Sequence, residues 1–281
     1  MRRPGASVKR ELLWTATSVR SGIMRAALAN RTRADLQYSF RVSEQHTYLS
    51  VENPKTGSTS VQAALTALDR GELEFDPEES PHVEFRKRTE ALVSGRRTGG
   101  VEALARAGYR IFTFIRNPYT RLLSNFHGIV VDGAPQKALV LEGLGRPTAD
   151  LSVPVSFEEF ISLVVSQSDE ETDPHWRSQT AQILPGVIPY TFVGRFESLA
   201  DDYEALLDHV DAGIRPTLPR FNRSRPGDGP AADAHFTPEL IKAVNTRYEA
   251  DFHNLGYAMA SDSVGEEARR AFPTGLFPFP S

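Results

Sequence analysis

The sequence contains no cysteine, which excludes disulfide bonds, thiolate metal ligands and a cysteine nucleophile. A chain without cysteine is compatible with a reducing compartment, so we expect a cytoplasmic location. No uninterrupted apolar run reaches the roughly 18 to 20 residues that a membrane-spanning helix needs. The basic amino-terminal extension, residues 1–46, lacks the continuous apolar region and cleavage site of a signal peptide. We expect it to be helical or partly disordered, and its arginines offer a route to peripheral contact with a membrane.

The sequence also lacks an excess of positive charge. Its 32 Lys and Arg residues face 36 Asp and Glu residues, which gives a formal net charge of -4. Nonspecific nucleic-acid binders are normally basic, so we expect no nucleic-acid partner and only a local anion site. With 281 residues and 40% hydrophobic content, the chain can bury one large core. We expect one domain over residues 47–258 and a carboxyl-terminal tail over 259–281.

Motifs of metal-dependent and covalent catalysis are missing as well. The sequence has no H-E-x-x-H pattern, no clustered set of metal ligands and no nucleophile elbow. We therefore expect neither a metal requirement nor a covalent enzyme intermediate.

What is present is a strand-to-helix stretch, Tyr48 to Leu68, with a polar turn in its middle. Tyr48 to Val51 suit a short buried strand. The apolar residues after the turn follow the i, i+3, i+4, i+7 spacing of a helix packed on a core: Val61, Ala64, Leu65 and Leu68. The stretch therefore predicts a strand, a turn and a helix in succession.

The turn has the composition of an anion site. It reads Lys55, Thr56, Gly57, Ser58, Thr59 and Ser60. Gly57 permits a positive φ angle, and the hydroxyls can cap a helix whose first N–H groups and dipole attract a phosphate. A serine-capped helix without a ligand is the plain alternative. A nucleotide kinase would need G-x-x-x-x-G-K-[ST], but Lys55 precedes Gly57 and the upstream glycine is missing.

A second strand-to-helix stretch begins at Ile111. Residues Ile111 to Ile115 form an apolar run typical of a central strand, after which Asn117 can cap and Pro118 can open a helix. Arg116 then lies at the carboxyl end of a strand, where open α/β sheets bind ligands, and Ser124 lies about two turns into the helix. A structural salt bridge for Arg116 and a packing role for Ser124 are the alternatives.

The remaining pattern predicts an α/β fold: a P-loop-like, three-layer domain with a central parallel sheet flanked by helices. A further strand is expected at 188–193. The sequence also predicts a capping box at Ser156 and Glu159, an irregular loop over 132–154 at the mouth of the site, and these helices: 82–94, 101–107, 199–210 and one starting at Thr237 and Pro238.

The two turns resemble the nucleotide-binding segments of the sulfotransferases that use 3′-phosphoadenosine-5′-phosphosulfate (PAPS), particularly the carbohydrate sulfotransferase branch. Pro54 to Ser60 resembles the 5′-phosphosulfate loop of that family, and Phe114 to Ser124 its 3′-phosphate segment. Three further segments resemble parts of the chondroitin- and dermatan-type Golgi enzymes: Asp173 to Gln179 (their His-Trp segment), Phe192 to Glu197, and Asp251 to Tyr257. The chain lacks the cysteines and membrane anchor of those lumenal enzymes, so we expect a soluble, bacterial-like form without Golgi residence.

The resemblance implies a role for each motif. Lys55 to Ser60 would hold the 5′-phosphosulfate of PAPS, with Lys55 also catalytic, and Arg116 with Ser124 would hold the 3′-phosphate. Asn222, Arg223 and Ser224 would close over the nucleotide, or form an exposed basic loop instead. An acceptor hydroxyl needs a base, for which we favour His82 over His175 because related enzymes place a histidine near His82; either could be a surface or buried structural histidine.

The predicted reaction is sulfuryl transfer from PAPS to a hydroxyl of a glycan, a glycolipid or a glycosylated small molecule. A P-loop phosphotransferase and a non-catalytic nucleotide- or polyanion-binding module remain alternatives. ATP use without PAPS would indicate the former, and nucleotide binding without transfer the latter. The sequence does not determine the oligomeric state.

Overall fold

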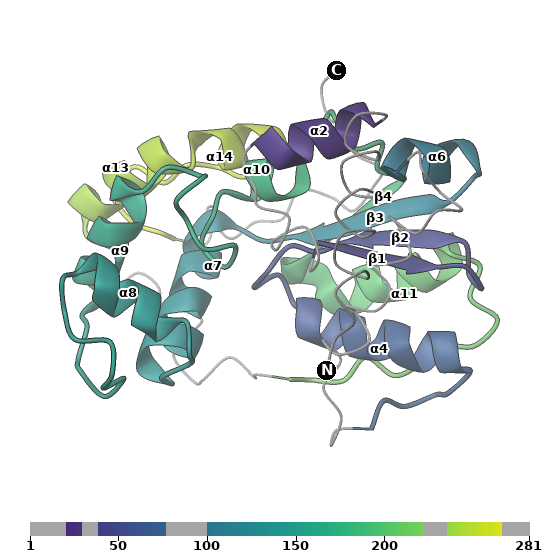
Figure 1. Ribbon diagram of the computed structural model, residues 1–281, viewed down its shortest axis with the longest axis horizontal. Coiled ribbons are helices and arrows are strands. Elements are labelled where there is room, and N and C mark those ends of the chain that lie inside the picture. Colours follow the sequence, from purple (N-terminus) through teal and green to yellow (C-terminus); the bar gives the residue numbers. More distant parts are fainter. Residues whose placement is uncertain (1–20, 30–38, 77–99, 222–234, 266–281) are drawn as a thin grey trace, which may run out of the picture.

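A computed structural model describes residues 21–29, 39–76, 100–221 and 235–265. Four strands form one sheet in the order β1-β2-β3-β4 (Figure 1). The strands are β1 (Phe40–Ser43), β2 (Tyr48–Val51), β3 (Arg110–Ile115) and β4 (Phe192–Arg195). β2, β3 and β4 run parallel, whereas β1 pairs antiparallel with β2. The predicted α/β fold with a central parallel sheet is confirmed. The edge strand β1 is an addition that the sequence pattern does not predict, since it is short and contains Arg41.

Helices cover both faces of the sheet and make the three layers. The helices α4 (Ser58–Arg70) and α11 (Leu199–His209) lie below the sheet in Figure 1, and α2 (Gly22–Ala29) and α6 (Gly100–Arg106) lie above it. The cluster on the α4 and α11 side includes Leu65, Phe112 and Leu206. The cluster on the α2 and α6 side includes Met24 and Ile111. Successive residues of β3 therefore point to opposite faces, as a strand buried on both sides requires.

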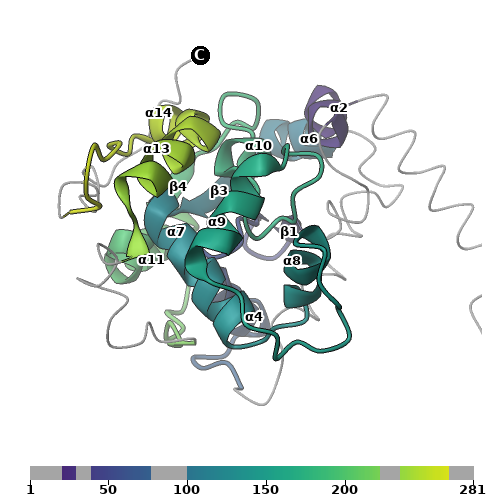
Figure 2. The same cartoon turned by 90° about the vertical axis from the view of Figure 1, so that its left-hand side faces the viewer.

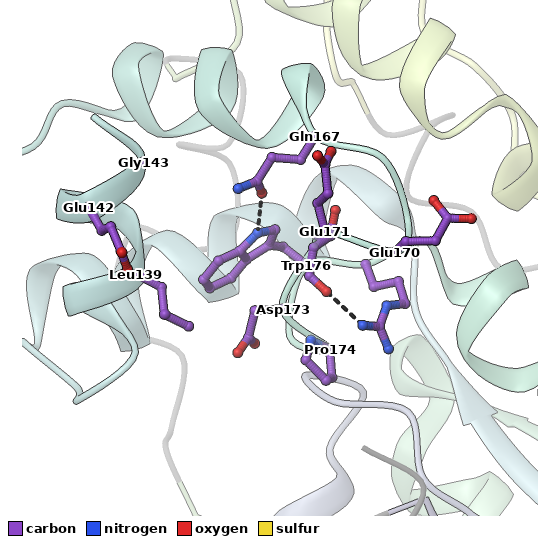
Figure 3. Close-up of a pocket in the computed structure, with 11 residues that line it drawn as sticks. Leu139, Glu142, Gly143, Gln167, Glu170, Glu171, Asp173, Pro174 and Trp176 are labelled. Atoms are coloured by element: carbon purple, nitrogen blue, oxygen red, sulfur yellow. Dashed lines mark hydrogen bonds between the residues drawn. The ribbon is translucent and has the colours of Figure 1, made fainter. Parts of the chain in front are cut away.

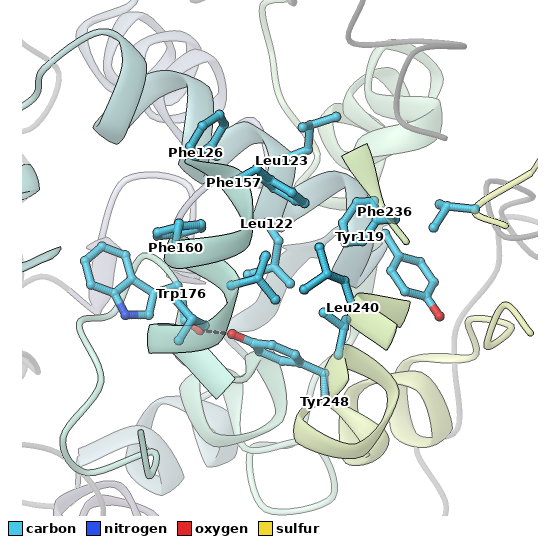
Figure 4. Close-up of a cluster of buried hydrophobic side chains, with 14 of the residues drawn as sticks. Tyr119, Leu122, Leu123, Phe126, Phe157, Phe160, Trp176, Phe236, Leu240 and Tyr248 are labelled. Carbon is cyan, nitrogen blue, oxygen red and sulfur yellow. Dashed lines mark hydrogen bonds between the residues drawn. The ribbon is translucent and has the colours of Figure 1, made fainter. Parts of the chain in front are cut away.

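A further group of helices gathers at the carboxyl end of β3, at the left of Figure 1 and in front in Figure 2. Its members are α7 (Pro118–Asn125), the π-helix η1 (Phe126–Val131), α8 (Lys137–Gly143), α9 (Phe157–Ser166), α10 (Gln179–Ile183), α13 (Pro238–Arg247) and α14 (Glu249–Leu255). Their shared core is aromatic, and Trp176, Tyr119 and Phe160 are among its fully buried side chains (Figure 4). This core holds α7, the helix that follows the second predicted anion turn.

Three helix starts follow the predicted capping chemistry. The side chain of Asn117 accepts the backbone N–H groups of Tyr119 and Thr120, and Pro118 opens α7. Ser156 and Glu159 form the complete capping box of α9, and Thr237 caps α13. These predictions are confirmed.

Three local predictions need correction. Gly57, not a hydroxyl of Ser58 to Ser60, is the N-cap of α4. The segment 132–154 is not wholly irregular, because it contains α8. The last strand begins at Phe192 rather than at 188, since Pro189 has no N–H group to donate to the ladder. The predicted helix 82–94 lies outside the described residues, and the division into 1–46, 47–258 and 259–281 stays a prediction.

Candidate functional site

The two predicted anion turns touch each other at the carboxyl edge of the sheet. Nη1 of Arg116 donates a hydrogen bond of 3.2 Å to the backbone carbonyl of Lys55. Its Nε donates to Oγ1 of Thr120 at 3.1 Å, and its guanidinium lies 3.8 Å from the ring centroid of Phe196. Lys55 and Arg116 therefore belong to one site, which adjacent parallel strands make possible because their carboxyl ends meet at the same edge.

A buried glutamine fastens the two turns together. Oε1 of Gln179 accepts from Nδ2 of Asn53 and from the backbone N–H of Arg116, both at 3.0 Å. Its Nε2 donates to the carbonyl of Arg116 at 2.7 Å. The backbone N–H groups of Gln179 and Thr180 in turn donate to the carboxylate of Asp251 at 2.8 and 2.7 Å. Burial nevertheless raises the pKa of Asp251 above its ordinary value.

The start of α4 has the form of a phosphate cradle. Gly57 has φ 81°, and among the described residues no side chain caps this helix end. A β-carbon on Gly57 would lie 2.7 Å from Cδ2 of Leu199, so only glycine leaves the turn its present path. The first N–H groups of α4 and the positive end of its dipole then offer a place for an anion.

The turn's hydroxyls have different surroundings. Oγ1 of Thr56 donates to the carbonyl of Asn53 at 2.7 Å and so closes the turn. The side chain of Ser58 bonds the carboxyl of Glu52, and Oγ of Ser60 accepts the backbone N–H of Phe221 at 3.4 Å. Thr59 is half-buried. Phe221 directly precedes Asn222, Arg223 and Ser224, which lie outside the described residues.

Lys55 has an unusual backbone and an unusual charge environment. Its φ angle is 69°, in the left-handed region that non-glycine residues rarely adopt. Burial, followed by the nearby cations of Arg116 and Arg121, lowers the pKa of Lys55 to about 8, while Asp132 acts in the opposite direction. The three neighbouring cations of Lys55, Arg116 and Arg121 would favour an anionic ligand, because each bound negative charge would relieve the repulsion among them.

Arg121 is a site residue that sequence reasoning missed. It is fully buried on α7, and its guanidinium donates to three backbone carbonyls: Pro54 at 2.9 Å, Arg177 at 2.7 Å and Pro174 at 3.2 Å. Burial lowers its pKa from the ordinary value. In the sequence Arg121 looks like one polar residue beside an apolar helix stripe, which gives no signal of this bridging role.

Through Arg121 the turn of Lys55 is linked to the segment that carries His175. Nδ1 of His175 lies 2.6 Å from Oδ1 of Asp173, and Nδ2 of Asn125 donates to the backbone carbonyl of His175 at 2.8 Å. Burial opposes ionisation of Asp173, but the hydrogen bond and charge of His175 outweigh it and hold the pKa of Asp173 below its ordinary value. His175 is 32% exposed, so its ring is oriented by a carboxylate yet reachable.

Of the other predicted residues, Ser124 is half-buried on α7, and His82 lies outside the described residues. Within the described ranges no group of three or more His, Cys, Asp or Glu side chains could hold a metal ion. Metal independence itself stays a prediction.

A cavity of about 370 Å³ is lined in part by neighbours of His175 in the chain, among them Asp173 and Trp176 (Figure 3). Leu139 and Glu142 of α8 form one wall, and Asp173 and Trp176 form another. Neither Lys55, Arg116 nor His175 lines it. The cavity is therefore a neighbour of the candidate site and not the site itself.

Comparison with known proteins agrees with this geometry. The model of the sulfotransferase family matches residues 38–258. The chain belongs to the sulfotransferase family. Its curated relatives include human carbohydrate sulfotransferase 8, 26% identical over 78% of this chain and 54% of the relative, and mouse carbohydrate sulfotransferase 14, 29% identical over 54% of this chain and 43% of the relative. Carbohydrate sulfotransferase 12 of Xenopus laevis is 25% identical over 55% of this chain and 41% of the relative.

This family member thus spans about half the length of these curated relatives. No solved structure matches the chain with significance.

The prediction of a cytoplasmic location is wrong. The matched relatives are carbohydrate sulfotransferases, the branch whose lumenal Golgi members the motifs resemble. The missing cysteines misled the prediction, because their absence removes disulfides without selecting a compartment. None of the helices in the described ranges combines the length and apolar character needed to cross a bilayer.

Proposed function

We propose that this sulfotransferase moves the sulfuryl group of PAPS to a hydroxyl of a carbohydrate, including glycolipids and glycosylated small molecules, by in-line displacement. The observation that carries the proposal is the contact between the Lys55 turn and Arg116, with a hydrogen bond of 3.2 Å. This contact supports the proposal, because two neighbouring cationic residues could bind the two phosphate groups of one doubly phosphorylated nucleotide. The relatives' names support a carbohydrate acceptor. A chondroitin or dermatan acceptor stays a prediction from the motif resemblance.

In the proposed donor site, the turn from Lys55 to Ser60 binds the 5′-phosphosulfate end. Arg116 and Ser124 bind the 3′-phosphate, and a contribution of Asn222 to Ser224, which lie outside the described residues, stays a prediction. The fit rests on the open start of α4 at Gly57 and on the buried, stacked guanidinium of Arg116. Alignment and charge stabilisation are the main demands of such a transfer, as in phosphoryl transfer.

For the base we infer His175, with His82 as the competing residue. Asp173 accepts the Nδ1–H of His175, which leaves the lone pair of Nε2 to take the acceptor's proton. As that proton moves to Nε2, the acceptor oxygen bonds to sulfur and the bond between sulfur and the phosphate oxygen breaks. Lys55 donates a hydrogen bond to the departing oxygen of 3′-phosphoadenosine-5′-phosphate. The positive charge of Lys55 is worth on the order of 1.5–3 kcal/mol in such a contact.

The donor site is tested by calorimetric binding of 3′-phosphoadenosine-5′-phosphate against AMP. The native protein should prefer the doubly phosphorylated nucleotide by roughly 10- to 100-fold, the equivalent of one charge-assisted contact. Arg116→Ala should abolish that preference. Arg215→Ala, which removes a surface arginine paired with Glu204 and Asp208, is the matched control and should keep it. Equal affinity of the native protein for the two nucleotides would contradict the assignment.

The base is tested by comparing His175→Ala and His82→Ala with His253→Ala, whose side chain is 73% exposed on α14. We expect His175→Ala to bind the nucleotide normally and to lose about 100- to 10,000-fold in transfer rate from labelled PAPS. The control should transfer at the native rate. Native turnover in His175→Ala, with loss in His82→Ala, would move the role to His82.

A further inference from the structure

The ammonium group of Lys55 lies against a glycine on the neighbouring helix. A β-carbon built on Gly128, in η1, would lie 2.6 Å from Nζ of Lys55 and 3.8 Å from its Cε. No real β-carbon tolerates the shorter distance. The lysine side chain thus ends in the space that Gly128 leaves by having no side chain.

The backbone does not explain why residue 128 is glycine. Gly128 is absent from the glycines with positive φ, and the residue is helical. An alanine would therefore fit the local backbone, and among the described residues outside its own helix it would meet only the Lys55 side chain within 4 Å. Because that group is the flexible end of a side chain, the lysine would move and the helix would stay.

The position of Gly128 ties this space to the donor site. Gly128 lies four residues after Ser124, so the two share one face of the continuous helix α7–η1. Asn125, three residues before Gly128, bonds the carbonyl of His175. The same helix therefore contacts Lys55 and the segment of the inferred base. π-helical turns within α-helices often occur at functional sites.

We propose that Gly128 is a positioning residue for sulfuryl transfer: by lacking a side chain, it fixes where the Lys55 ammonium lies relative to the departing phosphate oxygen. This inference rests on the proposed function for its catalytic part. Its structural part, the placement of the Lys55 ammonium against Gly128, does not depend on the proposed function.

The test compares Gly128→Ala with Gly213→Ala. A β-carbon on Gly213 would meet nothing within 4 Å, which makes it the matched control. We expect Gly128→Ala to bind 3′-phosphoadenosine-5′-phosphate within about threefold of native affinity and to lose 10- to 100-fold in kcat, because small misplacements of a catalytic group have effects of that size. Gly213→Ala should match the native protein in both.

A double-mutant cycle distinguishes an effect of Gly128→Ala on the position of Lys55 from a general disturbance of the fold. In a Lys55→Ala background, the Gly128→Ala change should have no further effect on kcat, since the side chain it displaces is gone. An equal loss in both backgrounds would overturn the proposal, as would a native kcat in Gly128→Ala alone.

The position of Lys55 can also be tested by a measurement that does not depend on sulfate transfer. The Lys55 Cε resonance, followed by NMR against pH, should show a titration midpoint about 0.5–1 pH unit higher in Gly128→Ala, because the displaced amine is better solvated. Gly213→Ala should not shift it. An unchanged midpoint in folded Gly128→Ala would contradict the placement of Lys55 against Gly128, whether or not the native protein transfers sulfate.

Discussion

At the residue scale, Lys55 combines a strained backbone conformation with two nearby arginine cations. A non-glycine residue at φ 69° costs on the order of 1–3 kcal/mol and persists only where its surroundings hold it. Here Arg116 bonds the carbonyl of Lys55, and Arg121 bonds the carbonyl of the preceding Pro54. The same two arginines lower the pKa of the lysine, so the contacts that hold the turn also shape its charge.

The first prediction concerns the pH dependence of nucleotide binding. Lys55, with a pKa of about 8, is charged below that pH and becomes neutral above it. Affinity for 3′-phosphoadenosine-5′-phosphate should therefore fall by up to tenfold per pH unit above about 8. Lys55→Arg keeps its charge and should lose that dependence. Calorimetry between pH 6.5 and 9.5 measures both, and parallel curves for the two proteins would refute the role of Lys55.

A second residue-scale prediction concerns Glu52, at the end of β2. Burial raises the pKa of Glu52 to about 7, against opposing hydrogen bonds from Ser58 and Gln62. Its folded pKa exceeds its unfolded one, so its stabilising contribution is full below pH 4.5 and is lost as pH rises through 7. Glu52→Gln should remove this loss. Between pH 5 and pH 8, its free energy of unfolding should therefore rise by about 1–2 kcal/mol relative to that of the native protein. Urea denaturation at the two pH values checks this. An identical change in both proteins would count against it.

At the element scale, one face of the continuous helix α7–η1 organises the site. Arg121, Asn125 and Gly128 lie along it at helical spacing and contact, in order, the carbonyl of Pro54, the carbonyl of His175 and the ammonium of Lys55. A single rigid helix thus sets the relative places of the donor turn and the inferred base. The apolar stripe of the helix, which includes Leu122 and Phe126, faces the aromatic core instead (Figure 4).

The element-scale prediction is that Arg121→Met destabilises the protein by about 2–4 kcal/mol. The substitution leaves three carbonyls without the donor they have now, and a buried acceptor that loses its partner is costly. Arg146→Met is the matched control, since Arg146 is 32% exposed and pairs with Glu159 near the surface. It should cost less than about 1 kcal/mol. Urea unfolding of both variants measures the two free energies of unfolding. Equal decreases would contradict the bridging role of Arg121.

At the scale of the whole molecule, the site is assembled from segments far apart in the chain. Asn53 follows β2, Arg116 follows β3, Gln179 opens α10, and Asp251 comes from α14 near the carboxyl terminus of the described chain. The carboxylate of Asp251 anchors the glutamine that joins the two anion turns. Nucleotide binding should therefore depend on the packing of the last helix.

The whole-molecule prediction is that Asp251→Asn weakens both stability and binding. Both carboxylate oxygens accept backbone N–H groups, whereas an asparagine would present an NH₂ group to one of them. We expect a loss of about 2–3 kcal/mol in unfolding free energy and at least a severalfold weaker affinity for 3′-phosphoadenosine-5′-phosphate. Glu249→Gln, 68% exposed on the same helix, should alter neither. If Asp251→Asn were destabilised but bound the nucleotide with native affinity, the packing of α14 would have no effect on nucleotide binding.

The sequence by itself determined the local elements around the site. The period of apolar residues gave β2, α4 and β3, and the proline and capping residues gave the starts of α7, α9 and α13. The motif resemblance led to the sulfotransferase family, which the match over residues 38–258 confirms. These features were predictable because they depend on neighbours within a few residues, whose spacing the sequence shows directly.

Only the tertiary structure decided which of these residues meet. Nothing in the sequence spacing indicates that Arg121 bridges Pro54 and Pro174, that Gln179 joins Asn53 to Arg116, or that Lys55 ends on Gly128. Such contacts join residues 53 to 126 positions apart, and buried polar groups find their partners only when packing brings those segments together. The order of parallel strands placed the two turns at one edge, and the buried hydrogen bonds then fixed their distance.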